Sequence, residues 1–299
     1  MSLTGEEMAA GFLNVLKPPG MSSHDVVGAA RKIFGVKRVG HAGTLDPAAA
    51  GVLPVAVGRA ARFIEYLSAV DKSYIAELKL GEETDSGDDT GQVVAKKENF
   101  SLPTLEEIEA ALAQFRGQIR QTPPAHSAIK IQGQRAYDLT RKQEAVTMPE
   151  REVTISRLEL TAYRPEAKKL LLSLDCSKGT YVRSLCRDIG RALGIPATMS
   201  FLVRTRVGDF SLAASFTLEE IKSHGQEALM PPETCLSHLP RVELPLSRRP
   251  AFCRGLGTTL REKQLDAPLL VFGGSEFWGV GSYNSRTGEL KPTKVFISE

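Results

Sequence analysis

Two segments of the chain carry apolar residues at the three- and four-residue spacing of an amphipathic helix, and each begins with a capping signal. Ser22 with Asp25 predicts the start of the first helix, and Gly35 predicts its end. Thr104 with Glu107 predicts the start of the second helix, which we expect to end at Gly117. The apolar faces consist of Val26, Val27, Ala30, Ile33 and Phe34, and of Ile108, Ala111, Leu112 and Phe115.

A third helix is expected over residues 183–193, because two kinds of side chain repeat around it at helical spacing. An apolar stripe and a basic stripe run two positions out of phase; they consist of Leu185, Ile189 and Leu193, and of Arg183, Arg187 and Arg191. We expect the apolar stripe to pack on the core and the arginines to face an anionic partner.

Strands are predicted where apolar residues alternate with other residues, as in residues 74–80 and 170–176. The alternating positions are Tyr74, Ala76, Leu78 and Leu80, and Leu170, Leu172, Leu174 and Cys176. Strands and helices do not alternate strictly along the chain. The expected fold class is therefore α+β, with a mixed and largely antiparallel sheet flanked by helices.

The composition changes between Pro231 and Pro250, where five prolines predict a linker between two domains. Three short apolar runs follow, at residues 268–272, 277–283 and 295–297, and turn residues separate them. We therefore expect a large domain of residues 1–240 and a small C-terminal β-barrel domain of residues 241–299.

The composition excludes several classes of protein. With 299 residues, 42% of them hydrophobic and 24% charged, the chain is expected to fold around a core. Its apolar runs are far shorter than the roughly 20 residues of a membrane span. Its first residues show no secretory signal, so we expect a cytoplasmic protein that is not associated with a membrane. Its four cysteines are scattered, which predicts reduced thiols and no metal site.

The net charge of +3 hides four basic clusters. Each cluster alone is compatible with ordinary solvated surface, but four in one chain favour a polyanionic partner. The clusters are Arg31, Lys32, Lys37 and Arg38; Arg116, Arg120, Lys130 and Arg135; six basic residues between Lys178 and Arg206; and six between Arg241 and Lys263.

The first candidate for chemistry is the stretch of residues 40–53, which is rich in glycine and small residues and contains Asp46 before Pro47. We expect a loop, because Gly40 and Gly43 allow the backbone to approach a ligand closely. An ordinary Asp-Pro turn is the alternative. A phosphate-binding loop is disfavoured, because no Gly-Lys-Ser/Thr follows at the required spacing.

The second candidate is the stretch of residues 176–183, where a predicted strand meets the arginine-bearing helix. Tyr181 and Arg183 are expected to be exposed there. A guanidinium can hold a carboxylate through two parallel hydrogen bonds, and an aromatic ring can stack on a base, so the pair suits a nucleotide site. A packing tyrosine and a surface arginine are the alternative.

These segments, taken in order, resemble the signature motifs of the TruB-type transfer RNA pseudouridine synthases. The resemblance spans nearly the whole chain, and its tail is similar to the small RNA-binding barrel, of the PUA type, that ends bacterial members. The matching segments are residues 17–23 (KPPGMSS), 40–53, 72–74 (KSY), 84–91 (TDSGDDTG), 115–117 (FRG) through 121–124 (QTPP), 176–183 and 202–208 (LVRTRVG).

The resemblance implies a role for each matching residue. Asp46 is implied to be the catalytic carboxylate, Arg183 its partner, and Tyr74 the residue that stacks on the target base. Tyr181 and Leu202 are implied to line the pocket. The remaining implied roles are entry into the T loop for His41 and structural roles for Lys17, Pro18 and Gly43.

The resemblance also implies the reaction and the partner. It implies conversion of uridine 55, in the T stem-loop of tRNA, to pseudouridine by a monomer without cofactor or metal. Residues 116–150 resemble a mobile segment that closes on RNA, and residues 241–299 are implied to bind a more distant stem. His126 departs from the aromatic residue that many relatives carry, so its contact is left open.

The residue chemistry is compatible with that reaction. The target base must leave its stack and be held by an aromatic ring. An aspartate is ionised at neutral pH, and we expect Arg183 to keep Asp46 so. Asp46 then attacks C1′ as a nucleophile or removes the C2′ proton as a base, and the sequence does not separate these routes. A non-catalytic RNA-binding or RNA-folding protein is the alternative function, and a nucleotide-dependent enzyme is a second one.

Overall fold

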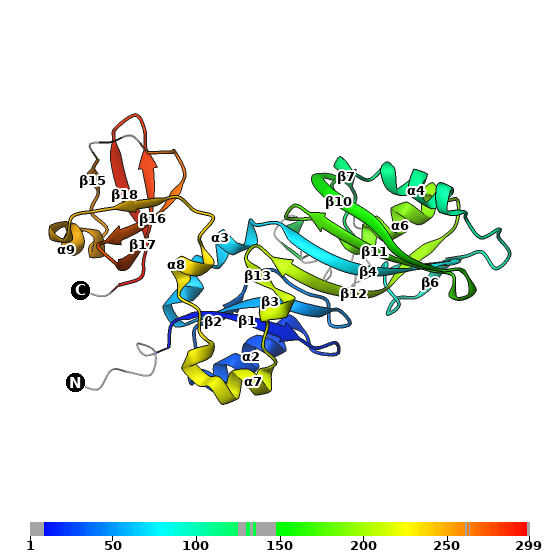
Figure 1. Ribbon diagram of the computed structural model, residues 1–299, viewed down its shortest axis with the longest axis horizontal. Helices are drawn as coiled ribbons and strands as arrows, with labels where there is room; N and C mark the ends of the chain where they lie inside the picture. Colours follow the sequence, from blue (N-terminus) through cyan, green and yellow to red (C-terminus); the bar gives the residue numbers. More distant parts are fainter. Residues whose placement is uncertain are drawn as a thin grey trace.

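The computed structural model describes residues 9–124, 130–131, 134–135, 148–260, 262 and 264–297. Much of the predicted segment 116–150, including His126, lies outside the described residues. Among the described residues, one nine-stranded sheet forms the large part of the molecule (Figure 1), in the order β1-β3-β12-β4-β11-β10-β7, with β13 on β12 and β2 on β3. Its strands are β1 (Gly11–Lys17), β2 (Val39–His41), β3 (Ala50–Val57), β4 (Lys72–Leu80), β7 (Gly117–Gln121), β10 (Arg151–Arg164), β11 (Lys169–Cys176), β12 (Ala197–Val207) and β13 (Phe210–Ser211).

The helices cover the two halves of this sheet separately (Figure 1). Helices α4 (Leu105–Ala113) and α6 (Val182–Ala192) pack on the half formed by β4, β10 and β12. Helices α2 (Ser23–Phe34) and α7 (Leu218–His224) pack on each other and on the half that contains β3. The shorter elements of this part are α3 (Ile64–Ser68), α8 (Pro232–Cys235), and the hairpins β5 (Glu82–Thr84) with β6 (Val93–Lys96) and β8 (Lys130–Ile131) with β9 (Gln134–Arg135). The mixed α+β fold agrees with the expectation.

Both predicted capping boxes are present. The side chain of Ser22 accepts a hydrogen bond from the backbone N–H of Asp25, and that of Thr104 accepts one from the N–H of Glu107. In turn, each carboxylate accepts a hydrogen bond from the backbone N–H of its N-cap residue. Gly35 ends α2 in the left-handed conformation. The predicted end of α4 at Gly117 is wrong, because the helix stops at Ala113 and Gly117 starts the edge strand β7.

The C-terminal residues form a second sheet, seen in orange and red in Figure 1. Its order is β14-β16-β17-β18-β15, and helix α9 (Arg249–Cys253) packs beside it. The strands are β14 (Arg241–Glu243), β15 (Thr258–Thr259), β16 (Pro268–Gly273), β17 (Glu276–Asn284) and β18 (Glu289–Val295). The stretch of residues 231–250, where the prolines predict a linker between two domains, contains the short elements α8 and β14.

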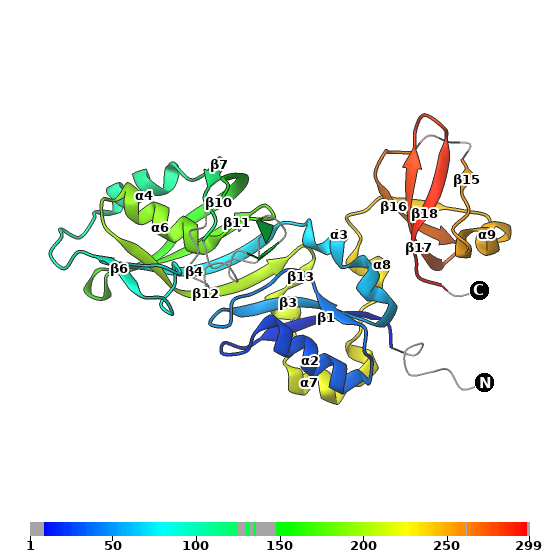
Figure 2. The same ribbon diagram turned by 180° about the vertical axis from the view of Figure 1, so that it is seen from behind.

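The second sheet lies on the same side of the large part as α3 and α8 (Figure 2), and packed side chains join the two parts. The rings of Phe63, Phe277 and Phe296 pack against one another in tilted orientations, with ring centroids 5.6–6.0 Å apart. Arg62 donates to the Val295 carbonyl at 2.9 Å. These contacts fix the C-terminal sheet beside α3. Within the described part of the chain, no helix combines the length and the apolar character of a membrane span.

Candidate active site

A cleft opens where the two halves of the large sheet separate. Strand β12 runs antiparallel to β4 but parallel to β3, and its ladder with β3 comprises two residues, Val203 and Arg204. The loop of residues 42–49 enters β3 at this split. The cleft has a volume of about 1290 Å³, and it is lined by this loop, by β4 and β12, by the start of α6 and by the loop of residues 85–92.

Asp46 and Arg183 meet in this cleft, although 137 residues separate them in the chain. The Arg183 Nε lies 3.0 Å from Asp46 Oδ2, and its Nη2 lies 3.3 Å from Asp46 Oδ1. This is the two-bond arrangement in which a planar guanidinium holds a carboxylate in one orientation. The Arg183 side chain is only 8% exposed, whereas 35% of the Asp46 side chain remains open.

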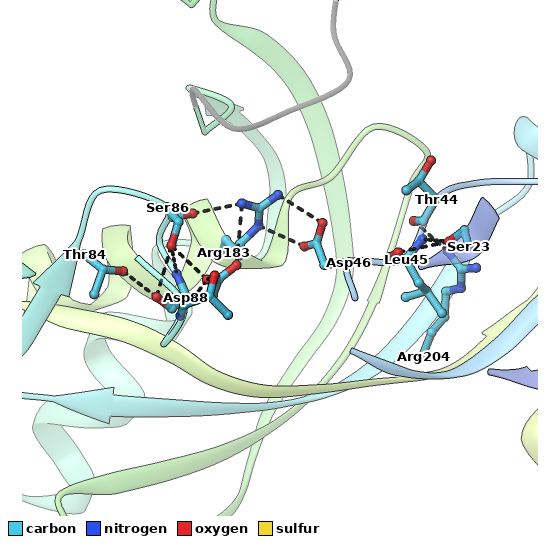
Figure 3. A network of polar contacts seen from close by, with 10 residues as sticks. Ser23, Thr44, Leu45, Asp46, Thr84, Ser86, Asp88, Arg183 and Arg204 are labelled. Atoms are coloured by element: carbon cyan, nitrogen blue, oxygen red, sulfur yellow. Dashed lines mark hydrogen bonds and ion pairs between the residues drawn. The ribbon is translucent and has the colours of Figure 1, made fainter. Parts of the chain in front are cut away.

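Arg183 is itself held from the side opposite to Asp46 (Figure 3). Its Nη1 donates to the Ser86 carbonyl at 2.9 Å and lies 3.7 Å from Asp88 Oδ2. Asp88 is buried and also accepts from the Ser86 hydroxyl at 2.8 Å. The guanidinium therefore lies between two carboxylates, Asp46 and Asp88, and both of these residues line the cleft.

The backbone around Asp46 is held by three buried side chains from distant elements. Ser23 accepts from the Leu45 N–H at 2.9 Å and donates to the Leu45 carbonyl at 3.0 Å (Figure 3). Arg204 donates to the carbonyls of Gly43 and Thr44 at 3.1 and 3.4 Å. Lys17 donates to the Pro47 carbonyl at 3.2 Å. The carboxylate therefore stands on a rigid loop, which favours a fixed reaction geometry.

Two glycines allow this loop to fit. Gly43 has a φ of +95°, a conformation that side chains rarely adopt. Gly51 has a φ of +111°, and a Cβ there would lie 2.2 Å from the Arg204 carbonyl oxygen. The contact of β3 with β12 thus requires glycine at position 51. Gly40 instead serves packing, because a Cβ there would meet the Ile64 side chain at 2.7 Å.

The structure brings the other predicted cleft residues around the same space. Tyr74 of β4 and Leu202 of β12 are buried, and both line the cleft with Tyr181 and His41. Burial, with a smaller contribution from Arg204, lowers the pKa of His41 and favours the neutral ring. Pro18, for which the resemblance implied a structural role, is exposed. Its carbonyl accepts a hydrogen bond from the buried Lys17 side chain at 2.9 Å.

The pKa of Asp46 is set by two opposing effects, burial and the neighbouring Arg183. Burial of the carboxyl raises the pKa, Arg183 lowers it, and the nearby Asp88 raises it again. The net direction is upward from the ordinary value, because burial outweighs the single cation. A raised pKa makes the carboxylate a stronger base than that of a solvated aspartate. The exposed 35% of the side chain faces the cleft. Such a group can act as a nucleophile or as a base.

Two expectations for this region are wrong. The stretch 40–53 is a loop only at residues 42–49, since β2 and β3 take its ends. Arg183 is buried rather than exposed. The arginines of α6 contact acidic side chains, Arg183 with Asp46, Arg187 with Asp188 and Arg191 with Glu83, and the Arg191 side chain remains 59% exposed.

The sequence alone indicated no role for Ser23, Asp88 or Arg204. All three lie in motifs that the resemblance singled out, but the contacts that tie them to the loop of Asp46 and to Arg183 span 22 to 161 residues and leave no local pattern. Among the described residues, no group of three or more His, Cys, Asp or Glu side chains is arranged to hold a metal ion.

Comparisons with known proteins agree with this architecture. The model of the TruB family pseudouridylate synthase N-terminal domain matches residues 31–182, and that of the tRNA pseudouridylate synthase B C-terminal domain matches residues 183–239. A tRNA pseudouridine synthase B of Dehalococcoides mccartyi is 42% identical over 97% of both chains. That of Caldanaerobacter subterraneus is 51% identical over 78% of this chain and 81% of its own.

Among solved structures, a chain of a Cbf5-Nop10-Gar1 complex superposes with a TM-score of 0.73 and 27% identity, covering 98% of this chain and 86% of its own. A chain of an H/ACA RNP bound to a substrate RNA containing 2′-deoxyuridine gives a TM-score of 0.72 at 25% identity, with 96% and 85% coverage. The matched family models, the close relatives and the shared fold together show that the chain belongs to the TruB family of pseudouridylate synthases.

Proposed function

We propose that this protein is an isomerase that converts a uridine of tRNA to pseudouridine, with Asp46 as the carboxylate that acts on the ribose. The observation that carries the proposal is the pairing of Asp46 with buried Arg183 at the wall of a cleft large enough for a nucleotide. The names of the relatives, each a tRNA pseudouridine synthase B, supply the reaction and the class of RNA.

The reaction exchanges one bond of the sugar for another. The bond from C1′ to N1 of uracil breaks, the base turns, and C1′ bonds to C5. C5 then loses its hydrogen as a proton, and N1 gains a proton. Because nothing is oxidised and the base stays bound, the proposed reaction needs no cofactor. Asp46 either forms an ester at C1′ or removes the C2′ proton, and both routes use its ionised form.

The walls of the cleft are suited to an extruded base. We propose that the ring of Tyr74 stacks on the uracil, and that Leu202 and Tyr181 enclose it. His41 lies on the same cleft, and we propose that it enters the T loop and fills the space that the base leaves. Arg183 is proposed to orient Asp46 for attack, as its two hydrogen bonds to the carboxylate suggest.

We propose that the two parts of the molecule have different roles. Residues 1–240 form the catalytic domain, with residues 116–150 as its RNA-binding segment, and residues 241–299 form the PUA-like domain that binds a more distant stem. The proposed substrate is the T stem-loop of tRNA, modified at U55 by a monomer in the cytoplasm. The tRNA named for the relatives supports this location and this partner.

An unmodified T-arm stem-loop tests the proposal. The RNA is incubated with the protein, with and without a chelator, and its nucleosides are analysed for a product whose base resists glycosidic cleavage. Conversion of U55 alone, equal with and without chelator, is the expected result. Tight RNA binding without any product would instead support the RNA-binding or RNA-folding function. A product at another uridine would refute the choice of U55.

A further inference from the structure

Gln121 makes an unusual pair of hydrogen bonds behind the wall of the cleft. It is the last residue of β7 and is 1% exposed. Its side-chain Nε2 donates to the Tyr181 carbonyl at 3.0 Å, and its Oε1 accepts from the Tyr181 N–H at 2.7 Å. One amide side chain thus satisfies both backbone groups of a residue 60 positions away.

The neighbouring residue adds two more bonds to the same helix. The Thr122 carbonyl accepts from the Ser184 hydroxyl at 2.7 Å and from Arg187 Nη2 at 3.3 Å. Residues 121 and 122 are therefore fastened to residues 181–187 by four hydrogen bonds. Tyr181 is the N-cap residue of α6, and its own side chain caps nothing. The start of α6 is held from outside by Gln121 rather than by a local cap.

The start of α6 is also the part of the helix that the site uses. Tyr181 lines the cleft, and Arg183 lies two residues further on, where it holds Asp46 through bonds of 3.0 and 3.3 Å. A shift of about 1 Å in such a group reduces a rate by about 10²-fold. Gln121 itself does not line the cleft. Its effect on the reaction must therefore pass through Tyr181 and Arg183.

We propose that Gln121 is a positioning residue: its amide sets the backbone of Tyr181, and with it the first turn of α6, so that Arg183 meets Asp46. The proposal rests on the proposed function for its catalytic consequence. The structural claim, that Gln121 fixes the backbone of Tyr181, depends only on the two hydrogen bonds of the Gln121 amide. It also gives the Gln-Thr-Pro-Pro motif of residues 121–124 a physical role at its first two positions.

The test compares Gln121→Met with Gln114→Met. Methionine keeps the length and burial of Gln121 but removes both of its hydrogen bonds. Gln114 follows α4, lies outside residues 116–150 and is exposed, and its side chain donates to the Ala110 carbonyl at 3.3 Å. Single-turnover rate, RNA dissociation constant and thermal midpoint are measured for each. We expect Gln121→Met to lose about 10- to 100-fold in rate with RNA affinity within about threefold of wild type, and Gln114→Met to be unchanged.

A second measurement does not depend on activity. Protein labelled with ¹⁵N-tyrosine gives at most six backbone amide signals, and Tyr181→Phe identifies that of Tyr181. We expect the Tyr181 amide to exchange with solvent at least about tenfold faster in Gln121→Met than in wild type, while the other tyrosine signals stay unchanged.

Each outcome decides the proposal. An unchanged exchange rate at Tyr181, or a Gln121→Met rate within about twofold of wild type, would overturn it. A weaker RNA affinity with an unchanged rate would assign Gln121 to RNA contact and overturn it as well. Faster exchange at all tyrosines would indicate general loosening, which also contradicts it. If wild type makes no pseudouridine, the proposed function fails, whereas the exchange measurement still decides whether Gln121 holds Tyr181.

Discussion

Replacing Arg183 by methionine removes the cation that opposes the burial of Asp46. The guanidinium contacts both carboxylate oxygens, at 3.0 and 3.3 Å. Two charges about 4 Å apart, at an effective dielectric constant of about 20, interact by about 4 kcal/mol. Because 35% of the Asp46 side chain is open to solvent, screening reduces this to about 1.4–2.8 kcal/mol.

The sign follows from the form of Asp46 that reacts. Only the carboxylate is a nucleophile or base, so activity is lost as the pH falls through the pKa of Asp46. Burial already raises that pKa in the wild type, and loss of Arg183 raises it further. We therefore expect the acid limb of the pH–rate profile to move to higher pH in Arg183→Met. Arg183→Lys retains the charge and should move the limb less, although its rate falls because the two-bond geometry is lost.

Single-turnover rates between pH 4 and pH 9, at saturating protein, provide the measurement. Circular dichroism at each pH confirms that the variants remain folded. An acid limb that stays in place in Arg183→Met, or moves to lower pH, would refute the electrostatic role assigned to Arg183. If the acid limbs of wild type and Arg183→Met fall at the same pH but the plateau rate of the variant is lower, Arg183 orients Asp46 without affecting its charge.

Two further predictions concern the backbone that carries Asp46. Ser23→Ala leaves the buried N–H and carbonyl of Leu45 without their 2.9 and 3.0 Å partner, so urea unfolding should show a loss of about 1–3 kcal/mol, and an unchanged midpoint would contradict the role of Ser23. Gly51→Ala places a Cβ 2.2 Å from the Arg204 carbonyl oxygen at a φ of +111°, so strain and overpacking should together lower the free energy of unfolding by about 2–6 kcal/mol. Gly20→Ala is the control, because its φ is +91° but its Cβ has open space around it, and it should lower that free energy by about 1–3 kcal/mol.

Local features of the fold were predictable from sequence. The capping boxes at Ser22 and Thr104 act within four residues, and the alternation in β4 and β11 reflects burial of one sheet face. The end of α4 was missed because nothing at Ala113 signals it. Gly117 has the left-handed conformation typical of a helix end, with a φ of +85°, but there it starts a strand.

The candidate site was predictable as a set of residues but not in its energetics. The motif resemblance supplied Asp46, Tyr74 and Arg183, and the structure brings all three to one cleft. The burial of Arg183 and the upward pKa of Asp46 were missed, because both depend on atoms packed around them by distant strands. Gln121 was missed for the same reason, since its partner lies 60 residues away.

The central claim is that the carboxylate of Asp46 carries out the isomerisation, and release of the C5 hydrogen measures it directly. A T-arm stem-loop labelled with tritium at C5 of U55 is mixed with excess wild type or Asp46→Asn, and Asp89→Asn, an exposed aspartate on the neighbouring loop, is the matched control. Wild type and Asp89→Asn should release the tritium completely. Asp46→Asn should bind the RNA yet release tritium at least about 10²-fold more slowly. Release by Asp46→Asn within about tenfold of the wild-type rate would contradict the claim.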